Sequence, residues 1–317
     1  MKPLILITGP TGSGKSDLSV ALAKQLHTEV ISADSVQVYR GFTIGSGKIT
    51  EEEKDGVVHH LINTKDPEEF YSAADFQKEA QPIFEKLWQE GKVPIVCGGT
   101  ALYIHGLIYD LDFTKKPSKI QRDHLNHLYK EKGLEYMASM LKERDADLAA
   151  SVDLKNPRRI LRALERIESG SAKNDQLRKR RRDIDPLYIV LNWEREALYE
   201  RINRRVLKMV EEGLFEEVEC LCRVYGDRVK AMGSIGYKEV VRYLHGEWDK
   251  QTAIEKIQQH SRNLAKRQMT WFRKEKEAMF ISMSEETKGE ALTEILELEK
   301  EKYGTKRGSF RNRTEPK

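Results

Sequence analysis

The residues best suited to chemistry in this sequence form the segment Gly9-Pro-Thr-Gly-Ser-Gly-Lys-Ser16. The segment matches the phosphate-binding pattern G-x4-G-K-[ST] in the expected context, after an apolar run and at the start of a helical pattern. Its glycines let backbone N–H groups approach phosphate oxygens, the helix N-terminus adds partial positive charge, and Lys15 adds a full charge. The pattern therefore predicts that a diphosphate or triphosphate is bound by Gly9, Pro10, Thr11, Gly12, Ser13, Gly14, Lys15 and Ser16, with the Ser16 hydroxyl as a ligand of Mg²⁺.

The ends of two later strands supply further candidates. The apolar run from Val93 to Cys97 ends in Gly98-Gly99-Thr100, without the acid that holds Mg²⁺ in hydrolytic nucleotide enzymes of this type. Asp34 follows a short strand, Glu29 to Ser32, and so lies at the carboxyl edge where open α/β sheets bind ligands. Asp34 is therefore a candidate general base. A turn-forming or helix-capping aspartate explains the same residue, and both interpretations remain open.

Strand and helix patterns alternate before residue 110. Apolar patterns predict strands over 2–8, 29–32 and 93–97, a helix from about Gly14, and a helix that is capped by Asp75 and stopped by Gly91. Only helical periodicity follows from 118 to 167, then a strand at 187–191 and a mostly helical stretch over 194–302. This order indicates an α/β fold with right-handed crossovers. We expect a P-loop NTPase-like parallel sheet core (1–111 and 186–302), a helical insertion domain (112–185), a helical C-terminal region and a basic mobile tail (303–317).

Composition excludes several classes of protein. Apolar residues make up 39% and charged residues 33% of the 317, a balance typical of globular domains and not of disordered chains. No apolar run approaches the length of a membrane-spanning helix, and Met-Lys-Pro leads directly into a predicted strand, so we expect neither a membrane span nor a leader. Three cysteines cannot form a disulfide framework, which favours a cytoplasmic location. A monomer is the default expectation.

Positive charge is gathered in patches, although the net charge is only +4. Five consecutive bases run from Arg178 to Arg182, and a second basic stretch from Arg262 to Lys276 contains Trp271 and Phe272. One face of a predicted helix carries Arg158, Arg159, Arg162 and Arg166. Basic patches without interleaved acids favour a polyanion, and bases with aromatics suit RNA. A solvated helix face and, for the two aromatics, a place in the core are the alternatives.

Seven segments together resemble the family of tRNA dimethylallyltransferases, also called tRNA isopentenyltransferases. They are GPTGSGKS (9–16), SADSVQVYRG (32–41), HHLIN (59–63), CGGTALYI (97–104), NPRRILRALE (156–165), GSIGYKE (233–239) and KRQMTWFRK (266–274). The segments occur in the family's order over about residues 4 to 280, and the second and the last are far more specific than the phosphate-binding loop. The chain resembles the bacterial type, which lacks a C-terminal zinc finger.

The resemblance implies transfer of the five-carbon group of dimethylallyl diphosphate to N6 of adenosine 37 in tRNAs that read codons beginning with U. The phosphate-binding loop then holds a prenyl diphosphate with Mg²⁺ as cofactor, and the tRNA anticodon stem-loop is the partner. Asp34 removes a proton from the weakly nucleophilic amine of a base flipped out of its stack. The resemblance places the base against Asp34, Ser35, Val36 and Gln37, and tRNA against Arg122, Arg158, Arg159 and Arg162.

Three expectations concern the departing diphosphate. Lys15 stabilises its charge. The Thr100 hydroxyl donates to its bridging oxygen or, alternatively, closes a turn after the two glycines. Arg201 and Arg205 lie four residues apart on a predicted helix. One of them is expected to reach the diphosphate, and we assign Arg205, although the sequence does not distinguish the two.

Two other functions remain possible at this point. The first is a small-molecule kinase that uses Asp34 as its base, but a kinase has no need of several basic patches. The second is an ATP-gated RNA-binding protein, which needs the acid that is missing after Cys97.

Overall fold

The computed structural model describes residues 1–109, 118–170 and 180–311, with side chains for all of these except 119 and 305–311. The chain divides into two compact units, Met1–Ile108 with Arg182–Lys317, and Tyr109–Arg181. The second unit thus begins and ends three to four residues before the expected bounds of the insertion, 112–185. Its end moves because Ile184 and Asp185 already pair with Lys2 and Pro3 in the sheet of the first unit.

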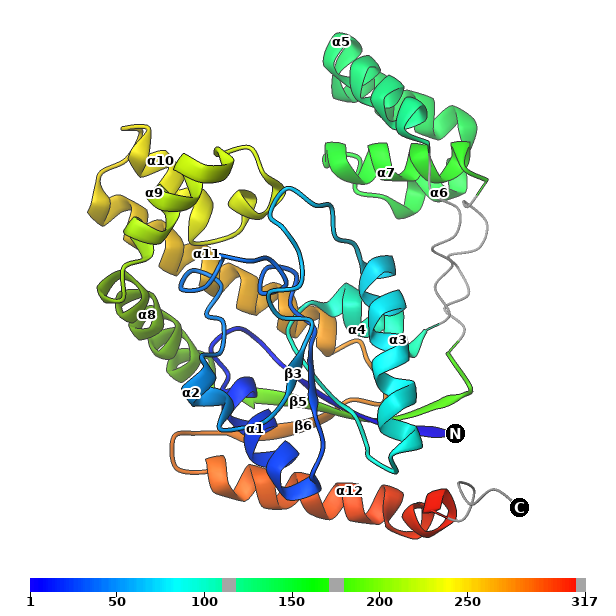
Figure 1. Ribbon diagram of the computed structural model, residues 1–317. Coiled ribbons are helices and arrows are strands. Elements are labelled where there is room, and N and C mark those ends of the chain that lie inside the picture. The colour runs from blue at the N-terminus through cyan, green and yellow to red at the C-terminus, as the bar shows by residue number, and fades with distance from the viewer. Residues whose placement is uncertain (110–117, 171–179, 312–317) are drawn as a thin grey trace. The chain divides into compact units, whose positions relative to one another are not determined.

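A parallel sheet forms the centre of the first unit, in the order β3-β2-β4-β1-β5-β6 (Figure 1). Its strands are β1 (Lys2–Thr8), β2 (Val30–Ser32), β3 (His59–His60), β4 (Ile95–Cys97), β5 (Ile184–Trp193) and β6 (Met279–Met283). All residues of β1 except Lys2 are buried, as expected of a central parallel strand with helices on both faces. The predicted α/β class with a parallel sheet is confirmed.

Helices cover both faces of this sheet. The helices of the first unit are α1 (Lys15–Leu26), α2 (Glu51–Lys54), α3 (Ala73–Gln89), α4 (Ala101–Ile108), α8 (Arg195–Glu211), α9 (Leu214–Tyr225), α10 (Tyr237–Leu244), α11 (Lys250–Phe272) and α12 (Lys288–Arg311). α1 and α12 pack together on one face, while α3, α4 and α11 lie on the other (Figure 1). Within the described ranges, no helix is long and apolar enough to cross a membrane.

Two local predictions are wrong. β6 lies inside the stretch predicted to be mostly helical; it is an edge strand of which only Ile281 and Met283 are buried, so its sequence lacks a continuous apolar run. The helix that begins near residue 73 is capped by Ser72, and Asp75 is its third helical residue. Asp75 accepts from the Ser72 N–H in a capping box, so its preference for helix starts is satisfied one turn later than predicted.

The predicted start of the basic tail, residue 303, lies inside a helix. α12 continues to Arg311, and Tyr303 is only 1% exposed. The Tyr303 hydroxyl donates to the carbonyls of Leu4 and Asp185, which joins this helix to the neighbouring strands β1 and β5. Tyr303 therefore belongs to the core of the first unit. The part of the predicted tail beyond Arg311 lies outside the described residues, as do residues 110–117 and 171–179.

The second unit is helical, as its periodicity predicts. It contains α5 (Lys119–Arg144), α6 (Ala146–Ser151) and α7 (Pro157–Glu168), and α5 is interrupted at Gly133, where φ is 78°. These helices bury a core of their own that includes Leu125, Met137, Leu141, Ile160 and Leu164.

Candidate active site

The phosphate-binding loop joins β1 to α1, and its donors point at the interior of the loop. Lys15 Nζ donates to the carbonyl of Pro10 at 2.7 Å, and the Ser13 N–H approaches the same oxygen at 3.3 Å. The Ser13 hydroxyl is buried and has no hydrogen-bond partner among the described residues. An ammonium, an N–H group and an unsatisfied hydroxyl in one small loop suit an anion with several oxygens.

A cavity of about 420 Å³ beside this loop brings together most of the predicted site residues. Those that line it are Thr11, Lys15, Ser16, Asp34, Ser35, Val36, Gln37 and Arg205. An adjoining hollow of about 670 Å³ shares Lys15, Ser16 and Arg205 with the cavity and is also lined by Gly12, Ser13 and Gly14. Gly9, Pro10 and Thr100 line neither of them. The two spaces therefore meet at Lys15 and Arg205.

Asp34 combines the two interpretations that the sequence left open. Its Oδ1 accepts from the N–H groups of Val36 and Gln37, at 2.8 and 3.2 Å, so it does form a turn. Its Oδ2 makes no hydrogen bond to any residue that the structure describes, and the residue lines the cavity. The turn fixes the side chain by one oxygen and leaves the other oxygen available for proton transfer.

The end of β4 is packed so closely that only glycine fits. A Cβ on Gly98 would lie 2.3 Å from the carbonyl oxygen of Ala33, the residue that follows the neighbouring strand β2. The next residue but one, Thr100, accepts at its Oγ1 from the Ser35 N–H at 3.2 Å. This contact places the Thr100 hydroxyl next to the Asp34 turn, although Thr100 does not line the cavity itself. Its hydroxyl proton is not used by this contact.

The Gln37 side chain, which the resemblance places against the base, already makes hydrogen bonds at both ends of its amide. Its Nε2 donates to the carbonyls of Ser46 and Gly47, and its Oε1 accepts from the Ser32 hydroxyl at 3.3 Å. Both ends of the amide thus hold the cavity wall together. For Gln37 to bind the edge of a base, it must give up one of these bonds.

The structure separates the two candidate arginines of α8. Arg205 lines the cavity and donates to the Thr11 hydroxyl at 3.1 Å, and burial lowers its pKa. A Cβ on Gly47 would lie 1.6 Å from the Arg205 guanidinium, so a side chain there would displace this guanidinium, and φ of Gly47 is +57°. Arg201 does not line the cavity, and it donates instead to the backbone of the loop at Gly12. This geometry favours the assigned Arg205 for contact with a ligand.

Burial lowers the pKa of two lysines near the cavity, Lys15 and Lys48, to about 8. Lys48 Nζ is held by the Tyr39 carbonyl at 2.7 Å and by Asn63 Oδ1 at 2.6 Å. Lys15 Nζ faces the interior of the loop. An anion bound there would favour the charged form of Lys15, so anion binding and proton uptake are coupled at this residue.

Gln268 is a site residue that no sequence pattern predicted, although it lies in segment 266–274, which carries part of the resemblance. Gln268 Oε1 accepts from the Thr11 N–H, and its Nε2 donates to the Gly99 carbonyl, both at 2.9 Å. The side chain therefore joins the phosphate-binding loop to the end of β4 from helix α11. A glutamine between bases and aromatics gave no signal of this role.

Glu217 of α9 is a second residue that the analysis missed. Its carboxylate accepts from three successive N–H groups, those of Thr43, Ile44 and Gly45, at 2.7 to 3.2 Å. It also accepts from the Tyr237 hydroxyl at 2.8 Å, and that hydroxyl accepts from the Ser46 N–H. Glu217 thus holds segment 43–46, next to the residues that line the cavity. Its position among other acids predicts only a solvated helix face.

The basic face of α7 contains an acid, so the expected uniformly positive face is wrong. Arg162 pairs with Glu165 at 3.0 Å, and Arg122 of α5 pairs with the same carboxylate at 3.5 Å. Arg158 and Arg159 are exposed, and Arg158 lines a shallow hollow with Lys130 and Lys155. The surface remains basic overall, with Arg158 and Arg159 less neutralised than Arg162 and Arg122.

The two aromatics of the basic stretch 262–276 differ in burial. Phe272 is fully buried, and Trp271 donates from Nε1 to His105 Nε2 at 3.0 Å. The alternative that the aromatics belong to the core is confirmed for Phe272, whose burial excludes stacking of RNA bases on it, whereas Trp271 is only partly buried. The Arg178–Arg182 run lies partly outside the described residues.

Comparison with known proteins agrees with the motifs. A family model described as IPP transferase matches residues 37–275. A protein named tRNA dimethylallyltransferase from Macrococcus caseolyticus is 42% identical over 291 residues, which are 90% of this chain and 92% of the relative. One of the same name from Clostridioides difficile is 42% identical over 287 residues, 89% of this chain and 92% of the relative.

Solved structures give the same result. The tRNA isopentenylpyrophosphate transferase of Bacillus halodurans superposes with a TM-score of 0.74 at 37% identity, covering 98% of this chain and 100% of that one. A eukaryotic dimethylallyltransferase acting on tRNA superposes with a TM-score of 0.77 at 28% identity, and the match covers 90% of this chain and 75% of that one. The resemblance derived from the sequence motifs is confirmed.

Proposed function

The chain belongs to the IPP transferase family, and from this membership we propose that it transfers the dimethylallyl group of dimethylallyl diphosphate to the N6 amine of adenosine 37 in tRNA. The observation that carries the proposal is the composition of one cavity. An anion-binding loop contributes Lys15 and Ser16, and the carboxylate of Asp34 lines the same space. These are the two groups that an amine alkylation with a diphosphate leaving group requires.

In the proposed reaction, N6 attacks C1 of the dimethylallyl group while Asp34 Oδ2 takes the N6 proton. The C1–O bond breaks, and diphosphate leaves with the bonding electron pair. Lys15, Arg205 and the N–H groups of the loop stabilise the charge of this leaving group. The Thr100 hydroxyl, held beside the Asp34 turn by Ser35, donates to the bridging oxygen.

The residues also fit Mg²⁺. Within the described ranges no cluster of three His, Cys, Asp or Glu side chains can hold a metal. Mg²⁺ does not need such a cage, because it commonly binds one protein oxygen, substrate phosphates and water. We propose that Ser16, which lines both spaces, holds the ion together with diphosphate oxygens. When bound, the ion neutralises part of the charge of the leaving group.

The second unit is proposed to bind the anticodon stem-loop. Arg158, Arg159, Arg162 and Arg122 support this role because they present basic side chains over α5 and α7. Such contacts with phosphates are sequence-independent and weaken with salt. A tRNA substrate also favours the expected cytoplasmic location, and we expect the enzyme to act as a monomer.

The test is transfer of radiolabel from dimethylallyl diphosphate to unmodified tRNA. We expect label in the tRNA and loss of labelling when adenosine 37 is replaced by guanosine. Phosphate release from ATP is measured in parallel, because a kinase or an ATP-gated protein would show it. ATP turnover without label in tRNA would contradict the proposal.

A further inference from the structure

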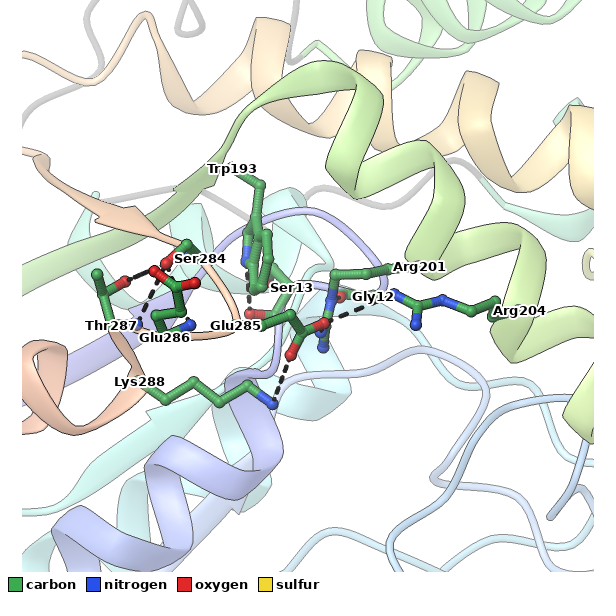
Figure 2. A network of polar contacts seen from close by, with 10 residues as sticks. All are labelled: Gly12, Ser13, Trp193, Arg201, Arg204, Ser284, Glu285, Glu286, Thr287 and Lys288. Carbon is green, nitrogen blue, oxygen red and sulfur yellow. Dashed lines mark hydrogen bonds and ion pairs between the residues drawn. The ribbon is translucent and has the colours of Figure 1, made fainter.

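Side chains from β5 and α8 hold the outer side of the phosphate-binding loop. Arg201 Nε donates to the Gly12 carbonyl, and Trp193 Nε1 donates to the next carbonyl, that of Ser13, both at 3.0 Å. The Arg201 guanidinium also lies over the Trp193 ring, 4.3 Å from its centroid. Figure 2 shows the two side chains side by side against the loop. They act as one stacked pair on two successive peptides.

These two bonds determine which groups of the loop face inward. In a trans peptide the C=O and N–H groups point in opposite directions. Holding the Gly12 carbonyl on the outer side therefore directs the Ser13 N–H inward, and holding the Ser13 carbonyl does the same for the Gly14 N–H. The Ser13 N–H indeed points at the Pro10 carbonyl, where Lys15 Nζ also donates.

Glu285 supports this pair from the turn between β6 and α12. Its carboxylate forms an ion pair and hydrogen bond with Arg201, and it lies 3.7 Å from Arg204 and 3.1 Å from Lys288 (Figure 2). The Arg201 bond, followed by the Lys288 bond, lowers the pKa of the Glu285 carboxyl. The carboxylate therefore stays charged at neutral pH.

The turn that carries Glu285 is itself fixed. Ser284 N donates to Thr287 Oγ1 at 2.8 Å, and Thr287 N donates to Ser284 Oγ at 3.2 Å. These reciprocal bonds hold residues 284–287 in one conformation at the start of α12. A support from the C-terminal part of the chain thus reaches the N-terminal loop.

We propose that Arg201 and Glu285 are positioning residues that set the affinity of the loop for the diphosphate of the donor. They act by fixing the orientation of the Gly12 and Ser13 peptides, while Arg205 contacts the diphosphate. This inference rests on the proposed function of the loop as a diphosphate site. The competing explanation is that these residues act only through their charges at the edge of the hollow.

The variant Glu285→Gln separates the two explanations by the sign of its effect. It removes a negative charge beside an anion site, so charge alone predicts tighter binding of an anion. A positioning role predicts weaker binding, because Arg201 loses its ion pair. The readout is the dissociation constant of inorganic pyrophosphate with Mg²⁺, measured by calorimetry at 0.5 M KCl, where exposed charges are strongly screened.

We expect pyrophosphate to bind Glu285→Gln several-fold more weakly than the wild type. We expect Arg201→Lys, which keeps the charge, to bind pyrophosphate about tenfold more weakly, because a tenfold change corresponds to the free energy of about one buried hydrogen bond. Lysine has no planar group to stack on the Trp193 ring, and its ammonium cannot reproduce the guanidinium geometry that contacts both Gly12 and Glu285. In turnover, KM for the donor should rise in both variants, with kcat at saturating donor and KM for tRNA nearly unchanged.

Arg204→Gln is the matched control. Arg204 lies on the same helix beside Glu285 and is 70% exposed, and it makes no hydrogen bond to the loop among the described residues. Its loss removes a full positive charge from the same region, so pyrophosphate affinity should change by less than about twofold once salt screens the charge. Thermal melts of each variant check that it is folded.

The outcomes are distinct. Tighter or unchanged binding of pyrophosphate in Glu285→Gln, or a loss in Arg204→Gln at least as large as that in Arg201→Lys, would overturn the inference. Wild-type affinity in Arg201→Lys would overturn it as well. If the wild-type enzyme itself binds no pyrophosphate, the proposed function fails, independently of this inference.

Discussion

The two backbone segments on either side of the cavity are held in opposite ways. In the phosphate-binding loop, the donors Arg201 and Trp193 take backbone carbonyls. In segment 43–46, the acceptor Glu217 and the Tyr237 hydroxyl take four successive N–H groups. The loop therefore presents N–H groups to its interior, whereas in the other segment the opposite carbonyls, those of Phe42, Thr43 and Ile44, accept from Ser46, Gly47 and Lys48.

The difference shows how a side chain that binds a loop from outside decides whether the loop presents N–H or C=O groups on its inner side. A peptide has one donor and one acceptor, so a side chain that binds one of them from outside leaves the other for the inside. Donors behind the loop leave its N–H groups for an anion, whereas acceptors behind segment 43–46 leave its carbonyls for hydrogen bonds within the cavity wall. A diphosphate is a ligand of the kind that suits the loop.

The largest effect is expected at Asp34, which lies between the two segments and belongs to neither. Asp34→Asn keeps an oxygen for the N–H groups of Val36 and Gln37, and so preserves the turn, but it removes the proposed base. We expect the single-turnover rate of transfer to fall by about 10³-fold, within the usual range for loss of a general base.

Binding is the control for this variant. The dissociation constants of tRNA and pyrophosphate should stay within about twofold of the wild type, because neither segment loses a support. Transfer within tenfold of the wild-type rate would mean that another group removes the proton.

A smaller effect is expected from Glu217→Gln, which weakens the support of segment 43–46 alone. An amide offers one acceptor where the carboxylate offers two, and its NH₂ group opposes the backbone N–H groups. The free energy of unfolding should fall by about 2 kcal/mol, as for lost hydrogen bonds to a charged group. We expect kcat/KM for tRNA to fall about tenfold through misplacement of the cavity wall, with pyrophosphate affinity nearly unchanged.

Glu216→Gln is the control for the charge. Glu216 is an exposed neighbour in the first turn of α9. It should leave both stability and kinetics near wild type. If Glu217→Gln weakened pyrophosphate binding as much as Arg201→Lys, the two segments would not be held independently.

The sequence predicts the parts of this site that are contiguous and fails for the supports behind them. Residues 9–16 and Asp34 are identified because a local pattern and a strand end are sufficient to place them. Trp193, Arg201 and Glu217 reach the loops through the tertiary fold, from positions about 170 to 190 residues further along the chain. Glu217 also stands in an acidic stretch, 211–219, where a single buried contact gives no separate signal.

The same limit applies to the fold. Parallel strands with long apolar runs, such as β1 and β5, are predicted because both of their faces are buried. β6 is missed because it is an edge strand, and Met279 and Phe280 are 40% and 41% exposed. Tyr303 is assigned to a tail because basic residues follow it, although its ring and hydroxyl are held by the core.

The smallest effect tests which of the two lysines with a lowered pKa, Lys15 or Lys48, titrates when an anion binds. The pKa of Lys15 is about 8, so its ammonium is mostly charged at pH 7 and mostly neutral at pH 8.5. Because a diphosphate binds the charged form, its dissociation constant should rise with pH, by about fourfold over this interval. Lys48 has a similar pKa, but Tyr39 and Asn63 hold its ammonium.

The measurement is the affinity for pyrophosphate as a function of pH in the wild type, Lys15→Arg and Lys48→Met. The titration of pyrophosphate itself is common to all three proteins. Lys15→Arg should lose the additional fourfold rise, since guanidinium stays charged, and Lys48→Met should keep it. The reverse result would place the titrating ammonium beside segment 43–46, and the contrast between an anion-binding loop and a carbonyl-presenting segment would then be wrong.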